Sequence, residues 1–314
     1  MLNRILILLS NTKNRAIVDI QINDLSKIYR GGSRALNKVN LSIGDGMFGL
    51  LGPNGAGKST LMRILVTLMK PTSGKVFVNG MDLQRNRRQV RTLLGYLPQD
   101  FRFFAKYRTW EFLDYSARLA GLKQSSYRRQ EVERLLEEVG LFEVRDRKAN
   151  RLSGGMKRRL GIAQALVGDP KIVIVDEPTT GLDPDERIRF RNLLSKMTER
   201  EMIIILSTHI VGDISSTCNK MALLHKGKVV FDGPPDGLLE KARGHVFQVS
   251  VSHLEYEEIK EKYQVISTIP SVHGWDLQLV ADQLDGYPGT PIEPNLEHAY
   301  VYFMEYIFDS PDNL

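Results

Sequence analysis

One stretch of the chain has the residue types and the spacing of a phosphate-binding loop. Residues 52–59 read Gly-Pro-Asn-Gly-Ala-Gly-Lys-Ser and match the G-x-x-x-x-G-K-[ST] pattern at every fixed position. Its glycines allow backbone N–H groups to turn towards phosphates, and a following helix adds a positive dipole end. We expect Lys58 to reach the outer phosphates and Ser59 to offer its hydroxyl to Mg²⁺. The expected nucleotide contacts are Gly52, Pro53, Asn54, Gly55, Ala56, Gly57, Lys58, Ser59 and Thr60.

A pair of carboxylates follows a buried apolar stretch about 120 residues further on. Residues 172–177 read Ile-Val-Ile-Val-Asp-Glu, and doubly wound sheets bind their ligands at such strand ends. Asp176 is expected to hold Mg²⁺, directly or through water, and Glu177 to accept a proton from an attacking water. The alternative is that Asp-Glu-Pro-Thr only ends a strand and caps the next helix.

The elements that position these groups follow from hydrophobic patterning. Alternation over residues 17–50 predicts half-buried strands, and residues 47–51 predict a short strand before the loop. Continuous apolar runs predict buried parallel strands near 171–175 and 202–206. The remaining expected elements are a helix at 61–69, a strand at 75–79, helices within 109–139, a helix at 156–167 and a crossover helix at 185–198. This alternation predicts a doubly wound α/β core with an inserted helical part.

Composition excludes several protein classes. Of 314 residues 42% are hydrophobic and 25% are charged, which is unlike a disordered or collagen-like chain. No run approaches the roughly 20 apolar residues of a membrane-spanning helix. The single cysteine, Cys218, cannot form an internal disulfide and fits a reducing compartment. We therefore expect a soluble, cytosolic protein.

Charge is distributed unevenly along the chain. Residues 245–314 hold 2 Lys and Arg against 12 Asp and Glu, so the formal net charge of +6 comes from the first 244 residues. Such a step predicts a boundary near Gly244 and an anionic partner for the basic part. Nucleotide, nucleic acid and a membrane surface all meet that description.

Residues 152–159, Leu-Ser-Gly-Gly-Met-Lys-Arg-Arg, resemble the signature motif of ATP-binding-cassette (ABC) ATPases. Met156 stands where that family most often has Gln. Further motifs fit the same family in the same order. Tyr29 stands at the position of an adenine-stacking aromatic residue, Gln99 resembles the glutamine loop, Asp183 ends a Gly-Leu-Asp loop, and His209 resembles the switch histidine.

The resemblance implies a P-loop NTPase core of the ABC ATPase type, with an inserted helical subdomain and a small C-terminal α/β appendix. It also implies that two cassettes pair head to tail, as a homodimer or with another cassette. ATP would lie between the loop of one copy and Ser153, Gly154 and Gly155 of the other. Glu177, His209 and Gln99 would then act on the γ-phosphate, the water and the Mg²⁺, while Asp183 lies near the nucleotide.

Several of these residues also have ordinary structural interpretations. Ser153 opens an expected helix and is a plausible N-cap, a role that is compatible with anion binding. Strand packing is the alternative for Tyr29, although stacking is the preferred interpretation. A strand-end histidine without a role is the alternative for His209, and its position after a buried strand favours the functional interpretation. His225, His245 and His273 have no metal-ligand spacing.

The expected role is the ATP-hydrolysing subunit of a membrane transporter, bound to the inner face of the membrane through a separate permease. Residues 50–55, 152–160 and 294–300 resemble ATPase subunits of bacterial drug, bacteriocin-resistance or polysaccharide exporters. The alternatives are an importer motor and a soluble ABC ATPase acting on nucleic acid or ribosomes. We expect no nucleic acid, because the coiled-coil, zinc or tandem-cassette features of such members are missing. The expected domains are a lead at 1–16 without an assigned role, a cassette at 17–244 with its helical subdomain near 100–168, and an acidic extension at 245–314.

Overall fold

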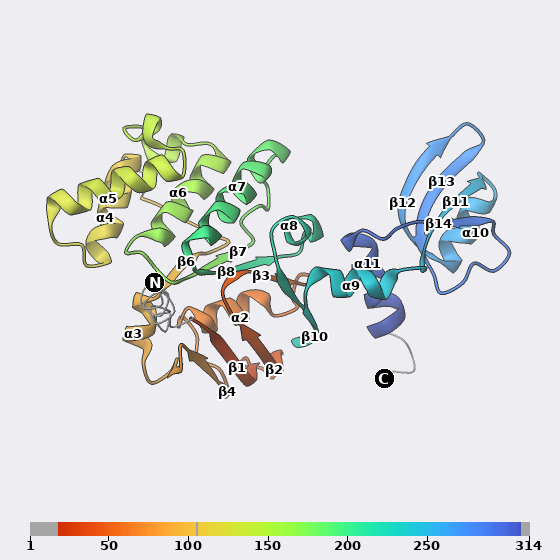
Figure 1. The fold of residues 1–314 in the computed structure, drawn as a ribbon, viewed down its shortest axis with the longest axis horizontal. Coiled ribbons are helices and arrows are strands. Elements are labelled where there is room, and N and C mark those ends of the chain that lie inside the picture. The colour runs from red at the N-terminus through yellow and green to blue at the C-terminus, as the bar shows by residue number, and fades with distance from the viewer. Residues whose placement is uncertain (1–17, 105, 309–314) are drawn as a thin grey trace, which may run out of the picture. The chain divides into compact units, whose positions relative to one another are not determined.

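The computed structural model describes residues 18–104 and 106–308. The chain divides into two compact units, one formed by Met1–Gly46 and Ser59–Ile205 and the other by Met47–Lys58 and Leu206–Leu314. The N-terminal lead expected at residues 1–16 lies outside the described residues. Figure 1 shows the elements in chain order.

An antiparallel sheet of order β2-β1-β4-β5 belongs to the first unit. Alternation places Ile20 and Ile22 of β1 on the buried face, where they pair with Ile43 and Leu41 of β2. The strands are β1 (Ile20–Ile28), β2 (Arg34–Ile43), β4 (Ser73–Val78) and β5 (Met81–Asp82). The alternating pattern of the sequence therefore corresponds to a sheet with one buried face.

The first unit also holds a parallel α/β part. Strand β7 (Ile172–Asp176) is buried along its whole length and pairs in parallel with β6 (Leu94–Leu97). The following helix α7 (Pro184–Met197) confirms the crossover helix expected at 185–198. Short helices α3 (Arg87–Thr92) and η3 (Thr198–Arg200) flank this part.

Three longer helices between β6 and β7 form the inserted helical part. Helices α4 (Thr109–Leu119), α5 (Ser125–Glu138) and α6 (Gly154–Leu166) pack against one another, as Figure 1 shows. Leu113, Leu135 and Leu160 contribute fully buried side chains, one from each helix. The turns η1 (Phe142–Val144) and η2 (Ala149–Arg151) connect α5 to α6.

The second unit contains the strand that leads into the phosphate loop. Strand β3 (Gly46–Leu51) pairs in parallel with β9 (Lys220–His225), which pairs antiparallel with β10 (Lys228–Gly233). Helix α2 (Lys58–Leu65) begins in this unit and continues into the first, and β8 (Ile203–Thr208) likewise runs from one unit to the other. Short helices α8 (Val211–Ser215) and α9 (Pro235–Ala242) follow β8 and β10.

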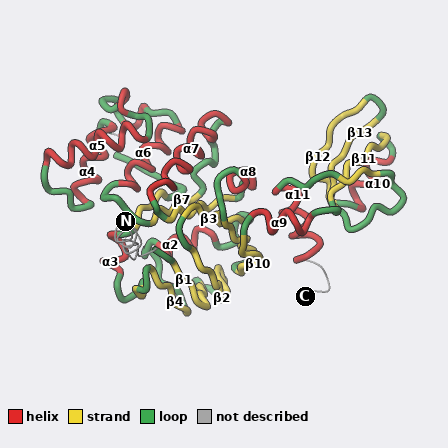
Figure 2. The backbone as a smooth tube through the Cα atoms, viewed as in Figure 1, coloured by secondary structure: helices red, strands yellow, loops and turns green. Residues whose placement is uncertain are grey.

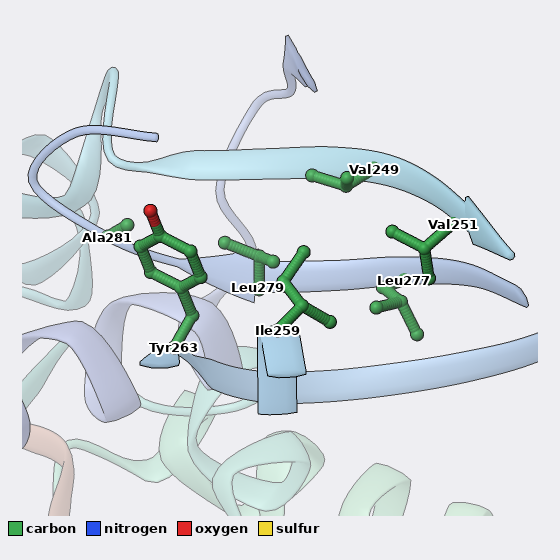
Figure 3. Close-up of a cluster of buried hydrophobic side chains, with 7 residues drawn as sticks. All are labelled: Val249, Val251, Ile259, Tyr263, Leu277, Leu279 and Ala281. Atoms are coloured by element: carbon green, nitrogen blue, oxygen red, sulfur yellow. The ribbon is translucent and has the colours of Figure 1, made fainter. Parts of the chain in front are cut away.

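The C-terminal part folds around a core of its own. Its sheet has the order β12-β13-β11-β14, and one helix, α10 (Glu255–Lys262), covers one face. Figure 1 labels the strands β11 (Val246–Ser252), β12 (Gln264–Ser271), β13 (Gly274–Val280) and β14 (Gly289–Pro291), and Figure 2 shows the sheet as strands in yellow. Figure 3 shows the buried side chains between sheet and helix: Val249, Val251, Ile259, Tyr263, Leu277, Leu279 and Ala281.

The last described segment joins this small domain to the β9–β10 hairpin within the second unit. Helix α11 (Leu296–Tyr302) continues into one π-helical turn, η4 (Phe303–Phe308). Phe303 packs on Phe231 of β10, and Phe308 packs edge-on against His225 with ring centroids 5.4 Å apart. On its other side, the Tyr302 hydroxyl donates to Asp282 over 2.7 Å.

Candidate active site

The phosphate loop has the backbone conformation that its glycines predict. Gly55 and Gly57 have φ angles of 82° and 108°, in the left-handed region that other residues adopt with strain. Gly52 follows β3, where an added Cβ would overlap the carbonyl oxygen of Leu224. Backbone therefore approaches backbone closely at the base of the loop.

The Lys58 side chain lies within the loop. Its Nζ donates to the carbonyl oxygens of Gly52 at 2.7 Å and Pro53 at 3.2 Å, and the residue is only 4% exposed. The loop is held from outside by the turn after β9, where the Gly227 N–H donates to the Ala56 carbonyl over 3.0 Å. The ammonium group is thus already placed among the backbone groups expected to surround phosphates.

Ser59 and Thr60 follow Lys58 in the first turn of α2. The Thr60 hydroxyl is bonded to the phenol oxygen of Tyr29 at 3.0 Å, which ties the end of β1 to the start of this helix. The Tyr29 ring remains 37% exposed. A partly exposed ring beside the helix start suits stacking on a base, although the stacking itself stays a prediction.

Asp176 and Glu177 are both buried at the end of β7, with exposures of 2% and 5%. Glu177 has a φ of 46°, a strained conformation for a residue with a side chain. Its Oε2 accepts hydrogen bonds from Gln99 Nε2 at 3.2 Å and from the Thr180 hydroxyl at 3.4 Å. Burial, backbone strain and fixed partners together mark a carboxylate held in one orientation.

The hard oxygen donors of Ser59 and Asp176 fit a Mg²⁺ ion, which prefers a hydroxyl or carboxylate ligand together with phosphate oxygens. Burial, with the Asp176 charge adding to it, raises the pKa of Tyr96 to about 12. Tyr96 therefore stays a neutral phenol beside the carboxylate. Among the described residues, no cluster of three or more His, Cys, Asp or Glu has metal-binding geometry.

Gln99 lies between the Glu177 carboxylate and a groove of about 660 Å³. One wall of this groove is the Gln99 loop and another is α4, through Ser116, Leu119 and Ala120. Leu119 is exposed there, so the groove has an apolar rim. A partner in the groove would touch the loop whose glutamine bonds to Glu177.

Two predicted nucleotide contacts act as helix caps. The Ser153 hydroxyl accepts from the Met156 N–H over 3.2 Å at the start of α6, which confirms the expected N-cap. Asp183 caps α7 by accepting from the Glu186 N–H at 2.8 Å. Gly155 is buried, and an added Cβ would overlap the Glu186 carboxylate. The first turns of α6 and α7 therefore approach closely at a position where only glycine leaves room for Glu186.

His209 is exposed directly after β8 in the second unit. The turn that carries it is fixed by Thr208, whose hydroxyl accepts from the Ile210 N–H at 2.9 Å and donates to Asp213 at 3.3 Å.

Of the predicted site residues, the structure joins Gln99 to Glu177 directly. Sequence reasoning missed Gly227 behind the loop and Arg158, which bonds to the Gln99 backbone. Both contacts link residues distant in sequence, so no local pattern indicated them.

Comparison with known proteins agrees with these motifs. The family profile described as ABC transporter matches residues 36–180. The bacitracin transport ATP-binding protein BcrA of Bacillus licheniformis is 34% identical over 234 residues, which cover 74% of this chain and 75% of the relative. The phosphonates import ATP-binding protein PhnC 2 of Synechococcus sp. is 36% identical over 241 residues, which cover 73% of this chain and 90% of the relative.

This chain is an ABC transporter ATP-binding subunit. Solved ABC cassettes have the same fold. The chain cbiO1 from Clostridium perfringens, part of the transporter complex cbiONQ, superposes with a TM-score of 0.65 at 28% identity, covering 71% of this chain and 90% of that one. A dimeric ATP-binding cassette in a post-hydrolysis state with ADP and phosphate superposes with a TM-score of 0.62 at 26% sequence identity. The match covers 68% of this chain and 98% of that one. The expected P-loop NTPase fold is confirmed, and the cassette binds and hydrolyses ATP. No helix among the described residues has the length and apolarity to cross a membrane.

Proposed function

We propose that this ABC subunit works as a head-to-tail pair beneath a separate permease and drives export. The observation that carries the proposal is the buried, strained Glu177, bonded by a glutamine whose loop also lines the groove. A catalytic carboxylate is thereby connected to a surface where a partner can bind. The dimeric cassette and the transporter complex among similar structures support both kinds of partner.

The side chains supply positioning and charge. Lys58 and the backbone N–H groups of its loop neutralise the outer phosphates, which is the main requirement in phosphoryl transfer. Glu177 accepts the proton of the attacking water, and His209 donates to the γ-phosphate. Tyr29 stacks on the base, and Ser153, Gly154 and Gly155 contact the γ-phosphate of the ATP held by the partner copy.

Ser59 and Asp176 would hold Mg²⁺, with Gln99 contacting it as the loop moves. When bound, Mg²⁺ neutralises charge that develops on the phosphate oxygens. Glu177 accepts hydrogen bonds from Thr180 and Gln99 and keeps the role of proton acceptor.

The groove beside α4 is the proposed permease site. It holds about 660 Å³, enough for one short helix or loop, and its lining combines the exposed Leu68 and Leu119 with Arg63 and Arg102. A permease segment with apolar and acidic side chains fits this lining. Binding there positions the subunit at the inner face of the membrane.

We favour export because residues 50–55, 152–160 and 294–300 resemble exporter ATPase subunits and because the C-terminal part is small, while the relatives include a phosphonates import protein as well as a bacitracin transport protein. We also propose that residues 17–244 form the cassette, with its helical subdomain near 100–168, and that 245–314 form an added domain. Replacing the chain with Glu177→Gln in the host tests the direction. If the subunit drives export, cells with the Glu177→Gln variant should become sensitive to a membrane-active antibiotic. Loss of nutrient uptake in those cells would instead indicate import.

Pairing itself is tested with the Glu177→Gln protein and MgATP. The amide keeps the size of the carboxylate but cannot accept a proton, and loss of a general base slows reactions by about 10²–10⁴-fold. ATP should then stay trapped between two copies, so light scattering should report a dimer with MgATP and a monomer without it.

Two further variants make this test specific. Lys58→Ala in the Glu177→Gln background should prevent pairing, because it removes the charge aimed at the phosphates. Ser153→Arg in the same background should also prevent it, since a bulky cation replaces the small hydroxyl. A Glu177→Gln protein that remains monomeric at saturating MgATP would count against the homodimer and favour pairing with another cassette.

A further inference from the structure

One side chain connects the Ser153 helix to the Gln99 loop. Arg158 lies five residues after Ser153 on α6, and its Nη1 donates to the backbone carbonyl of Gln99 at 2.6 Å and reaches that of Pro98 at 3.5 Å. A hydrogen bond from a guanidinium is charge-assisted and stronger than one between neutral groups. Because it binds the backbone, it fixes the loop itself.

The same loop continues the connection to the catalytic carboxylate. Gln99 Nε2 donates to Glu177 Oε2 at 3.2 Å. Ser153, Arg158, Gln99 and Glu177 therefore form one continuous path inside the first unit. A cavity of about 320 Å³, lined by Gln99, Arg158 and Thr180 among others, lies beside this path. The loop has room to move there, and the bond from Arg158 is one of the contacts that hold it.

Arg158 differs in this respect from its neighbour on the same helix. Arg159 forms an ion pair with Glu186 at 3.6 Å and donates to the carbonyls of Val139 and Gly140, which directly follow α5. Within the described ranges, no carboxylate lies at ion-pair distance from Arg158. The Arg158 guanidinium donates to the carbonyls of Pro98 and Gln99, so the Gln99 loop is its main polar partner.

We propose that Arg158 is a positioning residue that couples the two ATP sites of a dimer through one chain. The proposal rests on the head-to-tail pairing of the proposed function. Ser153 contacts the ATP held by the partner copy, whereas Gln99 and Glu177 act on the chain's own ATP. When α6 shifts as Ser153 engages, Arg158 draws the Gln99 loop with it and removes the glutamine N–H from Glu177. The carboxylate oxygen is then available to the water of the second site.

Steady-state ATPase activity against MgATP concentration tests the coupling. Two coupled sites give a Hill coefficient that approaches 2, and independent sites give about 1. Arg158→Met keeps the apolar stem and removes the donors, so its Hill coefficient should fall to about 1 with a less than twofold change in half-saturating ATP. Arg158→Lys retains one charged donor and should restore most of the cooperativity.

Arg159→Met is the matched control, because it removes the neighbouring guanidinium and leaves the Gln99 loop bonded. It should lower the melting temperature but not the Hill coefficient. Amide hydrogen exchange of residues 99–102 gives a second measurement that does not depend on pairing, and it should be faster in Arg158→Met. A merely structural role would reduce the active fraction without changing the Hill coefficient.

The outcomes separate this inference from the function on which it rests. A Glu177→Gln protein that fails to pair with MgATP defeats the head-to-tail dimer, whatever Arg158→Met does. If pairing occurs, a Hill coefficient of about 1 in the unaltered protein, or one unchanged in Arg158→Met, overturns the coupling. Unchanged exchange in residues 99–102 also overturns it, because the loop would then be held by other contacts.

Discussion

The backbone N–H of Gly227 donates to the carbonyl of Ala56 over 3.0 Å, so the turn between β9 and β10 supports the phosphate loop. His225, two residues earlier, packs edge-on against Phe308 at the end of the C-terminal helical segment. These contacts connect the C-terminal part to the candidate phosphate loop, within a single unit of the structure. Changes near the C-terminus should therefore be measurable at the nucleotide.

Phe308→Ala should weaken ATP binding about threefold. An edge-on aromatic pair contributes about 0.5–1.5 kcal/mol, and only part of that reaches the loop through the hairpin. Equilibrium dialysis with ATP measures the change. Tyr306→Phe is the control, because its hydroxyl donates to Val280 in the added domain and not to the hairpin. Equal effects of the two variants would show that the helical segment stabilises the domain without supporting the loop.

Tyr29→Ala should weaken ATP binding by about tenfold. Stacking of a base on an aromatic ring is worth about 1–3 kcal/mol, and the lower part of that range suits a ring that is partly exposed. Tyr29→Phe should bind ATP nearly as well as the unaltered protein, although it loses the bond to Thr60. Fluorescence titration with an ATP analogue compares them. If Tyr29→Phe is as weak as Tyr29→Ala, the hydroxyl bond to α2 matters and stacking does not.

Local patterns predicted the parts of the fold whose cause is local. The phosphate loop, the buried β7 and the N-cap at Ser153 depend on residues a few positions apart, and the structure places them as expected. The helix expected at 61–69 ends earlier, at Leu65, because Thr67 adopts a φ of 63° and turns the chain. The sequence signal failed where a strand was irregular or where a contact was long-range.

Strand β12 shows the first kind of failure. A register shift between Val265 and Ser267 breaks its alternation, and Pro270 lies near its end, so residues 264–271 do not read as a strand. The bond from Arg158 to Gln99 shows the second kind. It spans 59 positions, and its existence depends on how α6 packs near β6. The charge step at Gly244 predicts a separate C-terminal domain, and that boundary stays a prediction, while the aromatic contacts of the C-terminal segment with the β9–β10 hairpin required the fold.

Two neighbouring glycines of the signature motif should respond differently to alanine. At Gly155 a Cβ would overlap the Glu186 carboxylate, whereas at Gly154 the nearest contact is Leu182 at 4.0 Å. Overpacking costs about 1–3 kcal/mol, so Gly155→Ala should lower the melting temperature by several degrees. Gly154→Ala should leave it unchanged or raise it slightly, because alanine favours helix. Thermal unfolding followed by circular dichroism measures both. Equal melting temperatures would mean that Glu186 moves aside without cost.

The attachment of the C-terminal domain should weaken in acid because of His298 on α11. Its Nδ1 accepts from the Asn295 backbone N–H at 3.3 Å, so the neutral ring carries its proton on Nε2, which faces Gln278 Oε1 at 3.2 Å. Protonation would place a second donor against the Asn295 N–H. Burial lowers the pKa of His298, and the nearby Glu297 carboxylate opposes this only partly.

A histidine with a lowered pKa in the folded protein takes up a proton more readily when unfolded. The unfolded chain then binds more protons below its ordinary pKa of about 6.5, so the free energy of unfolding falls as the pH drops below that value. Thermal unfolding between about pH 7.5 and 5.5 should show a melting temperature that decreases as the pH falls. In the His298→Gln protein this decrease should be smaller, because the titrating ring is gone. His273→Gln is the control, because His273 is an exposed histidine in the β12–β13 turn. If His298→Gln and the unaltered protein lose stability in parallel across this range, the acid sensitivity comes from another group and the neutral ring at His298 is not what holds α11 to the sheet.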